Sequence, residues 1–268
     1  MMPLRLTCLW LSSSLLAAAA LGGCAEPRDP RFADASLAQL ERTFEAASGV
    51  ELGATLLMGI SVSGQDSPDS CPKIVTTGPD TTATGGCTIE DGVRMEGSIR
   101  VHNLPGVAGP AYDPSQPGSV EIDVRFTHPQ GEDVVLDGRV ELDGARISGD
   151  LTVDAEGITS TSRLALTCKD QSPCTPAADS EIEISGLGRA GVEGMWRLGP
   201  PSGRVTARGT DVIVFDIDGR DGEGCVPYTI NGVPRGPVCI PGLGEADELA
   251  LVYQHPMPWS KALRGTLR

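Results

Sequence analysis

The stretch VEIDVRFTHPQGEDVVLDGRVELDG, residues 120–144, decides the fold. Its apolar residues fall at every second position within 120–126 and again within 134–142. Gln130-Gly131 lies between the two runs and Asp143-Gly144 ends the second, and both pairs are typical of tight turns. Because the side chains of a strand alternate between two faces, this stretch predicts a β-hairpin with one buried face.

The same alternation continues on both sides of this hairpin. It predicts strands over 93–101, 147–153 and 164–166, and further strands near 181–187, 192–198, 203–208, 211–217 and 261–267. Turn pairs stand at Asp91-Gly92 and Glu156-Gly157. We therefore predict a mainly β protein built as an antiparallel meander.

The residues before this meander have a helical period. Ser36 followed by Gln39 matches a capping box, and Gly49 stands where a helix would end. The apolar residues of one helical face are Leu37, Leu40 and Phe44. One N-terminal amphipathic helix is therefore expected, packed on the sheet. From Val50 to Val62 apolar residues alternate again, which predicts a long strand with Glu51 on its polar side.

Glycines recur inside the predicted strands, each with an apolar residue two positions away on either side. They are Gly97, Gly138, Gly149, Gly194 and Gly265. Glycine weakens a strand unless a bend or a close approach requires it. The repetition favours a strongly curved sheet or an open barrel around the helix or a cavity. The alternative is a flat sandwich.

The N-terminus is typical of an exported protein. Arg5 precedes an apolar run, and Leu21-Gly22-Gly23-Cys24 follows it. This tetrapeptide resembles the lipobox of bacterial lipoproteins. The resemblance implies a diacylglycerol on Cys24, removal of residues 1–23, and a lipid anchor in the cell envelope. Since Ala25 rather than Asp follows the cysteine, the outer membrane is favoured, with the leaflet open. We expect a tether over 24–34 and one soluble β-rich domain over 35–268.

Composition limits the classes of partner. The chain carries a formal charge of −15, and removal of residues 1–23 takes away Arg5 and no acid, which gives −16. Such a surface repels nucleic acid. Gly (34) and Pro (21) are frequent and aromatic residues make up only 4%, as in chains of short strands and tight turns.

Six cysteines remain besides Cys8 and Cys24, and an even number in an exported chain indicates disulfides. Fifteen pairings are possible for six cysteines. We favour bonds between neighbours in the sequence, because each pair brackets one loop between strand-like segments: Cys71–Cys87, Cys168–Cys174 and Cys225–Cys239.

One segment carries a further resemblance. Cys71-Pro72, Gly86-Cys87, Asp91-Gly92 and Gly97-Ser-Ile99 follow one another within residues 71–101. Together with the lipobox, this order resembles uncharacterised exported bacterial lipoproteins. Thr84-Gly85-Gly86 replaces the aromatic-Gly that often precedes the second cysteine there. The resemblance supports the Cys71–Cys87 disulfide and the β fold, and implies no activity.

Candidate chemical groups are few. Asp216, Asp218 and Asp221 form the densest acidic stretch, and carboxylates on a glycine-rich loop can bind calcium, although their spacing departs from the EF-hand loop. The alternative is a solvated turn. No nucleophile pairs with any of the three histidines in the sequence pattern, so we expect no catalytic residues and no cofactor.

These features favour a membrane-anchored, non-enzymatic protein that binds an apolar ligand or a partner protein with a curved sheet. The expectation rests partly on the shape of periplasmic lipid carriers, to which a curved sheet with one helix is similar. The alternative is a structural or adhesion-type surface module, with calcium as a stiffening ion.

Overall fold

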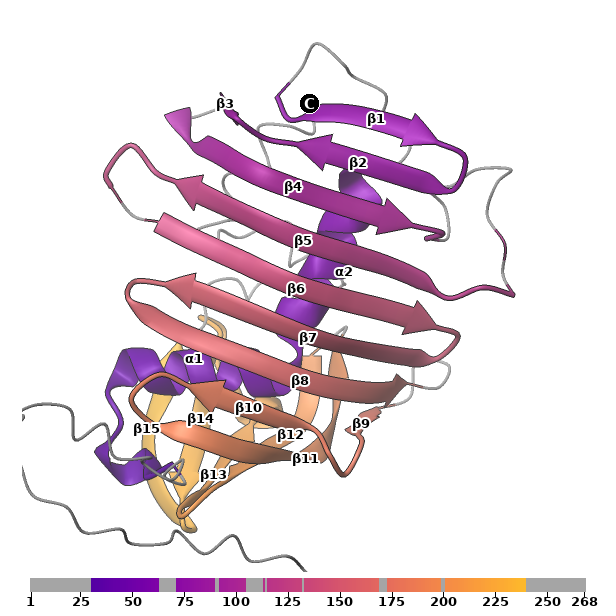
Figure 1. Ribbon diagram of the computed structural model, residues 1–268. Coiled ribbons are helices and arrows are strands. Elements are labelled where there is room, and N and C mark those ends of the chain that lie inside the picture. The colour runs from indigo at the N-terminus through magenta and orange to yellow at the C-terminus, as the bar shows by residue number, and fades with distance from the viewer. Residues whose placement is uncertain are drawn as a thin grey trace, which may run out of the picture.

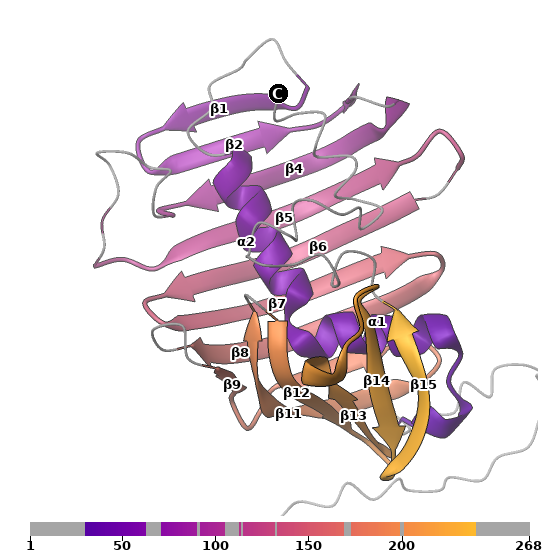
Figure 2. The same ribbon diagram turned by 180° about the vertical axis from the view of Figure 1, so that it is seen from behind.

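The computed structural model describes residues 30–62, 71–89, 92–104, 113, 115–131, 133–168, 173–198 and 201–239. Within these residues the chain forms one antiparallel sheet with two helices against one of its faces (Figures 1 and 2). The helical elements are η1 (Phe32–Asp34), α1 (Leu37–Ser48), α2 (Val50–Val62) and η4 (Ile217–Gly219).

The described residues contain fifteen strands. They are β1 (Lys73–Thr77), β2 (Asp80–Thr84), β3 (Cys87–Thr88), β4 (Arg94–His102), β5 (Gly118–Thr127), β6 (Asp133–Asp143), β7 (Arg146–Ala155), β8 (Ile158–Cys168), β9 (Cys174–Pro176), β10 (Glu181–Ile184), β11 (Gly188–Leu198), β12 (Pro201–Arg208), β13 (Val212–Asp216), β14 (Cys225–Ile230) and β15 (Val233–Cys239). Strands follow their sequence order across the sheet, except that β3 pairs with β4 and β9 lies between β8 and β11. The predicted meander is confirmed.

Tight turns join the central strands as the sequence predicts. At Glu156-Gly157 both residues have positive φ, 56° and 73°, so the β7–β8 turn has the handedness that suits twisted antiparallel strands. The predicted strand at 261–267 lies outside the described residues, as does Gly265. Sequence patterning missed β1–β3, β9, β14 and β15, which are short, threonine-rich or interrupted by proline.

Helix α1 begins and ends where the sequence predicts. Ser36 and Gln39 form a reciprocal capping box, and Gly49 ends the helix in the left-handed conformation with φ 72°. Leu40 and Phe44 are buried, but Leu37 is 56% exposed, so the apolar face is narrower than predicted. The packed part of the chain already begins at Pro30, within the expected tether.

The strand predicted over 50–62 is wrong, because these residues form helix α2. Every second position of a strand includes the i and i+4 positions of a helix, so the spacing of Leu52 and Leu56 suits both structures. Burial explains the rest: α2 is apolar on most of its surface and crosses the sheet diagonally. The molecule therefore has two N-terminal helices rather than one.

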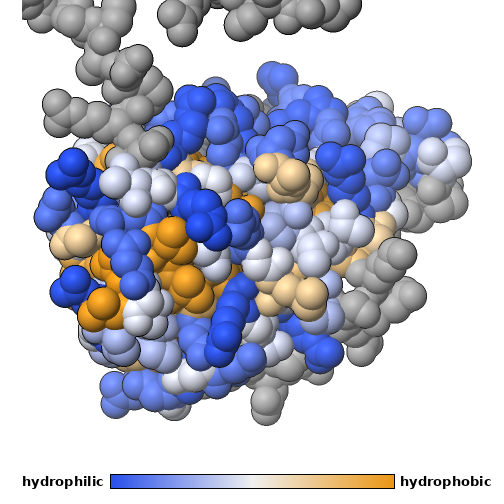
Figure 3. Space-filling view, turned by 90° about the horizontal axis from the view of Figure 1, so that it is seen from below, coloured by the Kyte–Doolittle hydropathy of each residue, from blue (hydrophilic) through white to orange (hydrophobic). Residues whose placement is uncertain are grey.

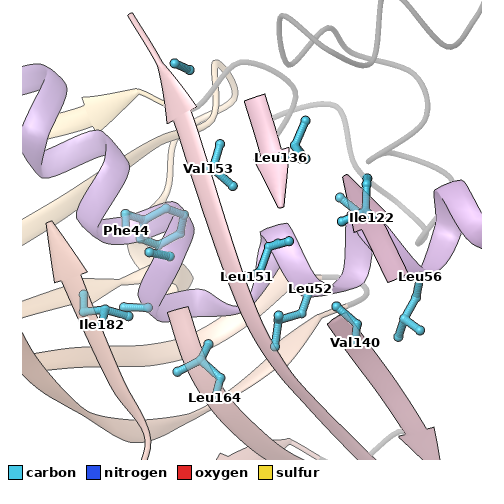
Figure 4. Close-up of a cluster of buried hydrophobic side chains, with 14 of the residues drawn as sticks. Phe44, Leu52, Leu56, Ile122, Leu136, Val140, Leu151, Val153, Leu164 and Ile182 are labelled. Atoms are coloured by element: carbon cyan, nitrogen blue, oxygen red, sulfur yellow. The ribbon is translucent and has the colours of Figure 1, made fainter. Parts of the chain in front are cut away.

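The core lies between the helices and the inner face of the sheet. Side chains from α1, α2 and strands β5–β10 converge there (Figure 4). Gly149 of β7 allows close contact, since a Cβ atom added to it would lie 2.7 Å from Leu52 Cδ2. Gly149 therefore allows α2 to pack close to β7.

The sheet curves strongly, as predicted, into a partial ring rather than into the open barrel that was the second possibility. Strands β10–β15 bend towards the helices, so that β14 and β15 lie on the same side as α1 (Figure 2). The ring stays open because β1 and β15 are the two ends of the strand order. Gly97, Gly138 and Gly194 have positive φ, of 92°, 149° and 134°, a backbone conformation that residues with a side chain rarely adopt.

All three predicted disulfides are present. Cys71–Cys87 joins the start of β1 to β3, while Cys168–Cys174 and Cys225–Cys239 join cross-strand neighbours. Such bonds form and persist in oxidising compartments, so the domain belongs outside the cytoplasm.

Candidate functional site on the outer face of the sheet

The two faces of the sheet differ in chemistry. The inner face packs against α1 and α2, whereas the outer face of β4–β8 and β10 presents charged and hydroxyl side chains to solvent. Large apolar side chains that are more than half exposed among the described residues are Leu37, Met195 and Val233. The outer face of β4–β8 and β10 is therefore a polar surface. The lower end of the molecule differs from it, because apolar residues gather there in one area among hydrophilic ones (Figure 3).

A row of six side chains with alternating charge crosses this surface. Successive members are direct cross-strand neighbours: Arg100, Glu121, Arg139, Asp150, Arg163 and Glu181. We call this row the charge ladder. With neighbouring strands about 4.8 Å apart, the ladder spans roughly 24 Å.

Ion pairs join most neighbours in the ladder. Arg139 Nη1 lies 2.9 Å from Glu121 Oε1, and Arg163 lies 3.2 Å from Asp150 and 2.9 Å from Glu181. The hydrogen bonds to Glu181 and Asp150 raise the pKa of Arg163 above its ordinary value. All of these side chains are at least partly exposed, so each pair stabilises the fold weakly.

The ladder is interrupted between Arg139 and Asp150. Although the two residues are cross-strand neighbours, the Arg139 guanidinium turns to Glu141, with Nη2 2.9 Å from Oε1. Arg139 and Asp150 both line two adjoining open hollows of about 560 and 410 Å³. These hollows form a shallow trough across the outer face, and the interruption lies in its middle.

The larger hollow is acidic. Asp123 and Asp137 are direct cross-strand neighbours and both line it. Like charges in this arrangement destabilise a sheet. The lining includes four carboxylates and two guanidinium groups, so the trough has an excess of negative charge.

A histidine lies at one end of the trough. His102 Nδ1 is 2.6 Å from Asp80 Oδ1, and Ser119 is the cross-strand neighbour of His102 on β5. A third hollow of about 310 Å³ contains all three residues. Sequence patterning gave no partner for this histidine, because the strand pairing that brings the three together is tertiary. Among the described residues no hydrogen bond joins Ser119 to the imidazole, and His102 and Asp80 are about half exposed.

The three aspartates considered for calcium serve other purposes in the structure. Asp216 pairs with Arg204 at 3.4 Å, Asp218 accepts the Gly203 N–H at 2.9 Å, and Asp221 accepts the Cys225 N–H at 2.9 Å. Across the residues described above, no three His, Cys, Asp or Glu side chains gather as a metal site would require. The calcium interpretation has no support from this arrangement, and its turn-forming alternative fits the contacts. Cys24 lies outside the described residues.

Helices in the described part of the chain are too short or too polar to cross a bilayer. Comparison with protein-family models, with curated proteins and with solved structures gives no match to this chain.

Proposed function

We propose that this protein is a lipid-anchored lipoprotein of the bacterial envelope that binds a partner protein, without catalysis, through the trough on its outer face. The proposal rests on the acidic trough, in the middle of which the charge ladder is interrupted. An exported site of action agrees with the three disulfides, and the lipobox at Cys24 supports the anchor.

The partner-protein interpretation is preferred to the apolar-ligand interpretation because of how the inner face is used. Leu52, Leu56 and Met58 of α2 are buried against the sheet in the space where an apolar ligand was expected. The large hollows of the outer face are open and lined by charged side chains. Surfaces of this kind suit a polar macromolecular partner.

The charges of the trough indicate the chemistry of that partner. Asp123 and Asp137 oppose each other across β5 and β6, and the larger hollow holds four carboxylates against two guanidinium groups. Lysine or arginine side chains of a partner would offset this negative potential. The charge of the whole chain, −15, would also attract a basic protein before contact.

Site-specific photocrosslinking in cells tests the binding surface. A photoreactive amino acid at Thr152, which lines the trough, should give a discrete adduct with a basic protein. The same amino acid at Glu223, on the exposed β13–β14 loop, is the control and should give none. The Asp123→Asn/Asp137→Asn variant should lose the Thr152 adduct. An adduct that forms equally at both positions, or that survives the double substitution, would contradict the proposal.

Fatty-acid labelling tests the anchor separately. Cells grown with an alkyne fatty acid should label the wild-type protein and leave Cys24→Ser unlabelled, and the variant should move from the membrane to the soluble fraction. Cys8→Ser, within the predicted signal, is the control and should not change the label. Label retained by Cys24→Ser would refute the anchor while leaving the binding surface to be judged by crosslinking.

A further inference from the structure

Three charged side chains meet in the interior, on the opposite side of the sheet from the trough. Arg42 of α1 lies with Nη1 2.8 Å from Glu45 Oε2 and 3.4 Å from Glu51 Oε1, where Glu51 belongs to the first turn of α2. All three side chains are at most 13% exposed. We call them the Arg42–Glu45–Glu51 cluster.

The two carboxylates have unequal sets of partners. Glu51 accepts hydrogen bonds from the hydroxyls of Ser160 and Ser162 on β8, at 3.2 and 3.1 Å, in addition to its contact with Arg42. Within the described residues, the Glu45 carboxylate has one ion-pair partner, Arg42, and no hydroxyl donor. Two buried carboxylates thus share one guanidinium. Since an unpaired buried charge is costly, a neutral cluster requires one bound proton. Glu45 is the better site for that proton, because fewer hydrogen-bond donors stabilise its ionised form than stabilise that of Glu51.

The surrounding charges favour the same proton. Glu41 on α1 and Glu156 in the β7–β8 turn both add negative potential at Glu45, and β8 contributes hydroxyls rather than a cation. Burial is the largest effect and raises the pKa of Glu45 to about 7, against the lowering effect of Arg42. Burial likewise raises the pKa of Glu51, opposed by Arg42 and the two serines.

The cluster lies at the corner where the two helices meet. Gly49 separates α1 from α2, and Trp196 Nε1 of β11 donates a 2.7 Å hydrogen bond to the carbonyl of Ser48 beside it. Glu51 connects this corner to β8 through the two serines. The corner therefore sets how α2 lies over the inner face (Figure 2).

We propose that a proton bound by the Arg42–Glu45–Glu51 cluster holds the α1–α2 corner against β8, and that loss of this proton loosens the corner. With Glu45 neutral, Arg42 and Glu51 form a balanced buried pair. With Glu45 ionised, a second negative charge faces Glu51 in a largely buried site, and the corner relieves the repulsion by moving towards solvent. An envelope protein meets the pH of its surroundings directly, so this would make the packing of α2 sensitive to external pH.

Trp196 supplies a reporter for the test. We would incorporate 5-fluorotryptophan into the full chain, assign the Trp196 fluorine resonance with the Trp196→Phe variant, and record spectra from pH 5.5 to 8.5. The expected result is a change in the Trp196 resonance with a midpoint near pH 7. Glu45→Gln, in which the amide mimics the protonated carboxyl, should hold the low-pH resonance throughout.

Glu96→Gln is the matched control, because Glu96 is an exposed acid that pairs with Arg94 on the outer face. It should titrate as the wild type does. A Trp196 resonance that does not change with pH in the wild type, or that changes identically in Glu45→Gln, would overturn the proposal. Failure of Glu45→Gln to fold would also overturn it, since the neutral side chain is the state that the proposal assigns to the folded protein.

Discussion

Two arginine–glutamate pairs in this protein have nearly equal lengths, yet their glutamate pKa values shift in opposite directions. Arg208 Nη2 lies 2.9 Å from Glu193 Oε2 on the outer face, and Arg42 Nη1 lies 2.8 Å from Glu45 Oε2 in the interior. The hydrogen bond from Arg208 lowers the pKa of Glu193. Burial raises the pKa of Glu45 to about 7 although its arginine is as close.

The difference shows that solvent exposure, rather than distance, decides what an ion pair does in this fold. Outer ion pairs keep their hydration, so they contribute little to stability. Their charges keep the outer surface of the open sheet hydrophilic and disfavour aggregation. The inner cluster has lost its hydration and holds one carboxylate too many. Its members therefore interact more strongly and link folding to the binding of a proton.

Removing the arginine of each pair should separate the two cases most clearly. Arg42→Ala leaves Glu45 and Glu51 buried without a cation, and at pH 8 we expect the free energy of unfolding to fall by about 3–5 kcal/mol. Arg208→Ala, the matched control, should change the free energy of unfolding far less, because the exposed Arg208–Glu193 pair is screened by solvent. Urea unfolding of both variants measures the difference. Equal losses would show that the inner cluster is effectively solvated.

The pH dependence of stability is the next largest effect. The folded-state pKa of Glu45 lies above its ordinary value of 4.5, so its contribution is fully present below pH 4.5 and is lost as the pH rises to about 7. That loss amounts to about 3 kcal/mol, from 1.36 kcal/mol for each pH unit. Urea midpoints at pH 5 and pH 8 should therefore differ more for the wild type than for Glu45→Gln. Glu193→Gln, whose glutamate has a lowered pKa, should not reduce the difference over this range.

Packing beneath α2 offers a smaller test that involves no charge. Gly149→Ala would place a Cβ atom 2.7 Å from Leu52 Cδ2, and Leu52 is fully buried, so either its side chain or helix α2 must shift. We expect a loss of about 1–2 kcal/mol in thermal or urea unfolding. Gly236→Ala on β15 is the control, because a Cβ atom there meets nothing within 4 Å. A neutral Gly149→Ala would mean that α2 packs loosely.

Much of the fold could be predicted from local signals in the sequence. The capping box at Ser36 and Gln39 is a contact within one turn, and the central hairpins need only alternation and turn pairs. The disulfides Cys168–Cys174 and Cys225–Cys239 were predictable because each joins strands that are adjacent in both sequence and space.

Features that depend on tertiary contacts could not be read in this way. The apolar residues of 50–62 fit both a strand and a helix, and only burial against the sheet decides for α2. The strand prediction placed Glu51 towards solvent, so the inner cluster was missed. The charge ladder was missed for a related reason: its residues are ordinary exposed charges until the register of six strands aligns them.

The smallest predicted effect concerns the two opposed carboxylates of the trough. Asp137→Asn removes the repulsion from Asp123, so the free energy of unfolding should rise by about 0.5 kcal/mol. The control is Asp154→Asn on β7, because Asp154 accepts a hydrogen bond from Thr159 at 3.1 Å and has no comparable repulsion to relieve. If the trough binds a basic partner, Asp137→Asn should also lower the yield of the Thr152 crosslink. If Asp137→Asn stabilises the fold and weakens the complex, the two opposed aspartates serve binding at the expense of stability. If it lowers stability instead, the two carboxylates do not repel each other in the folded sheet.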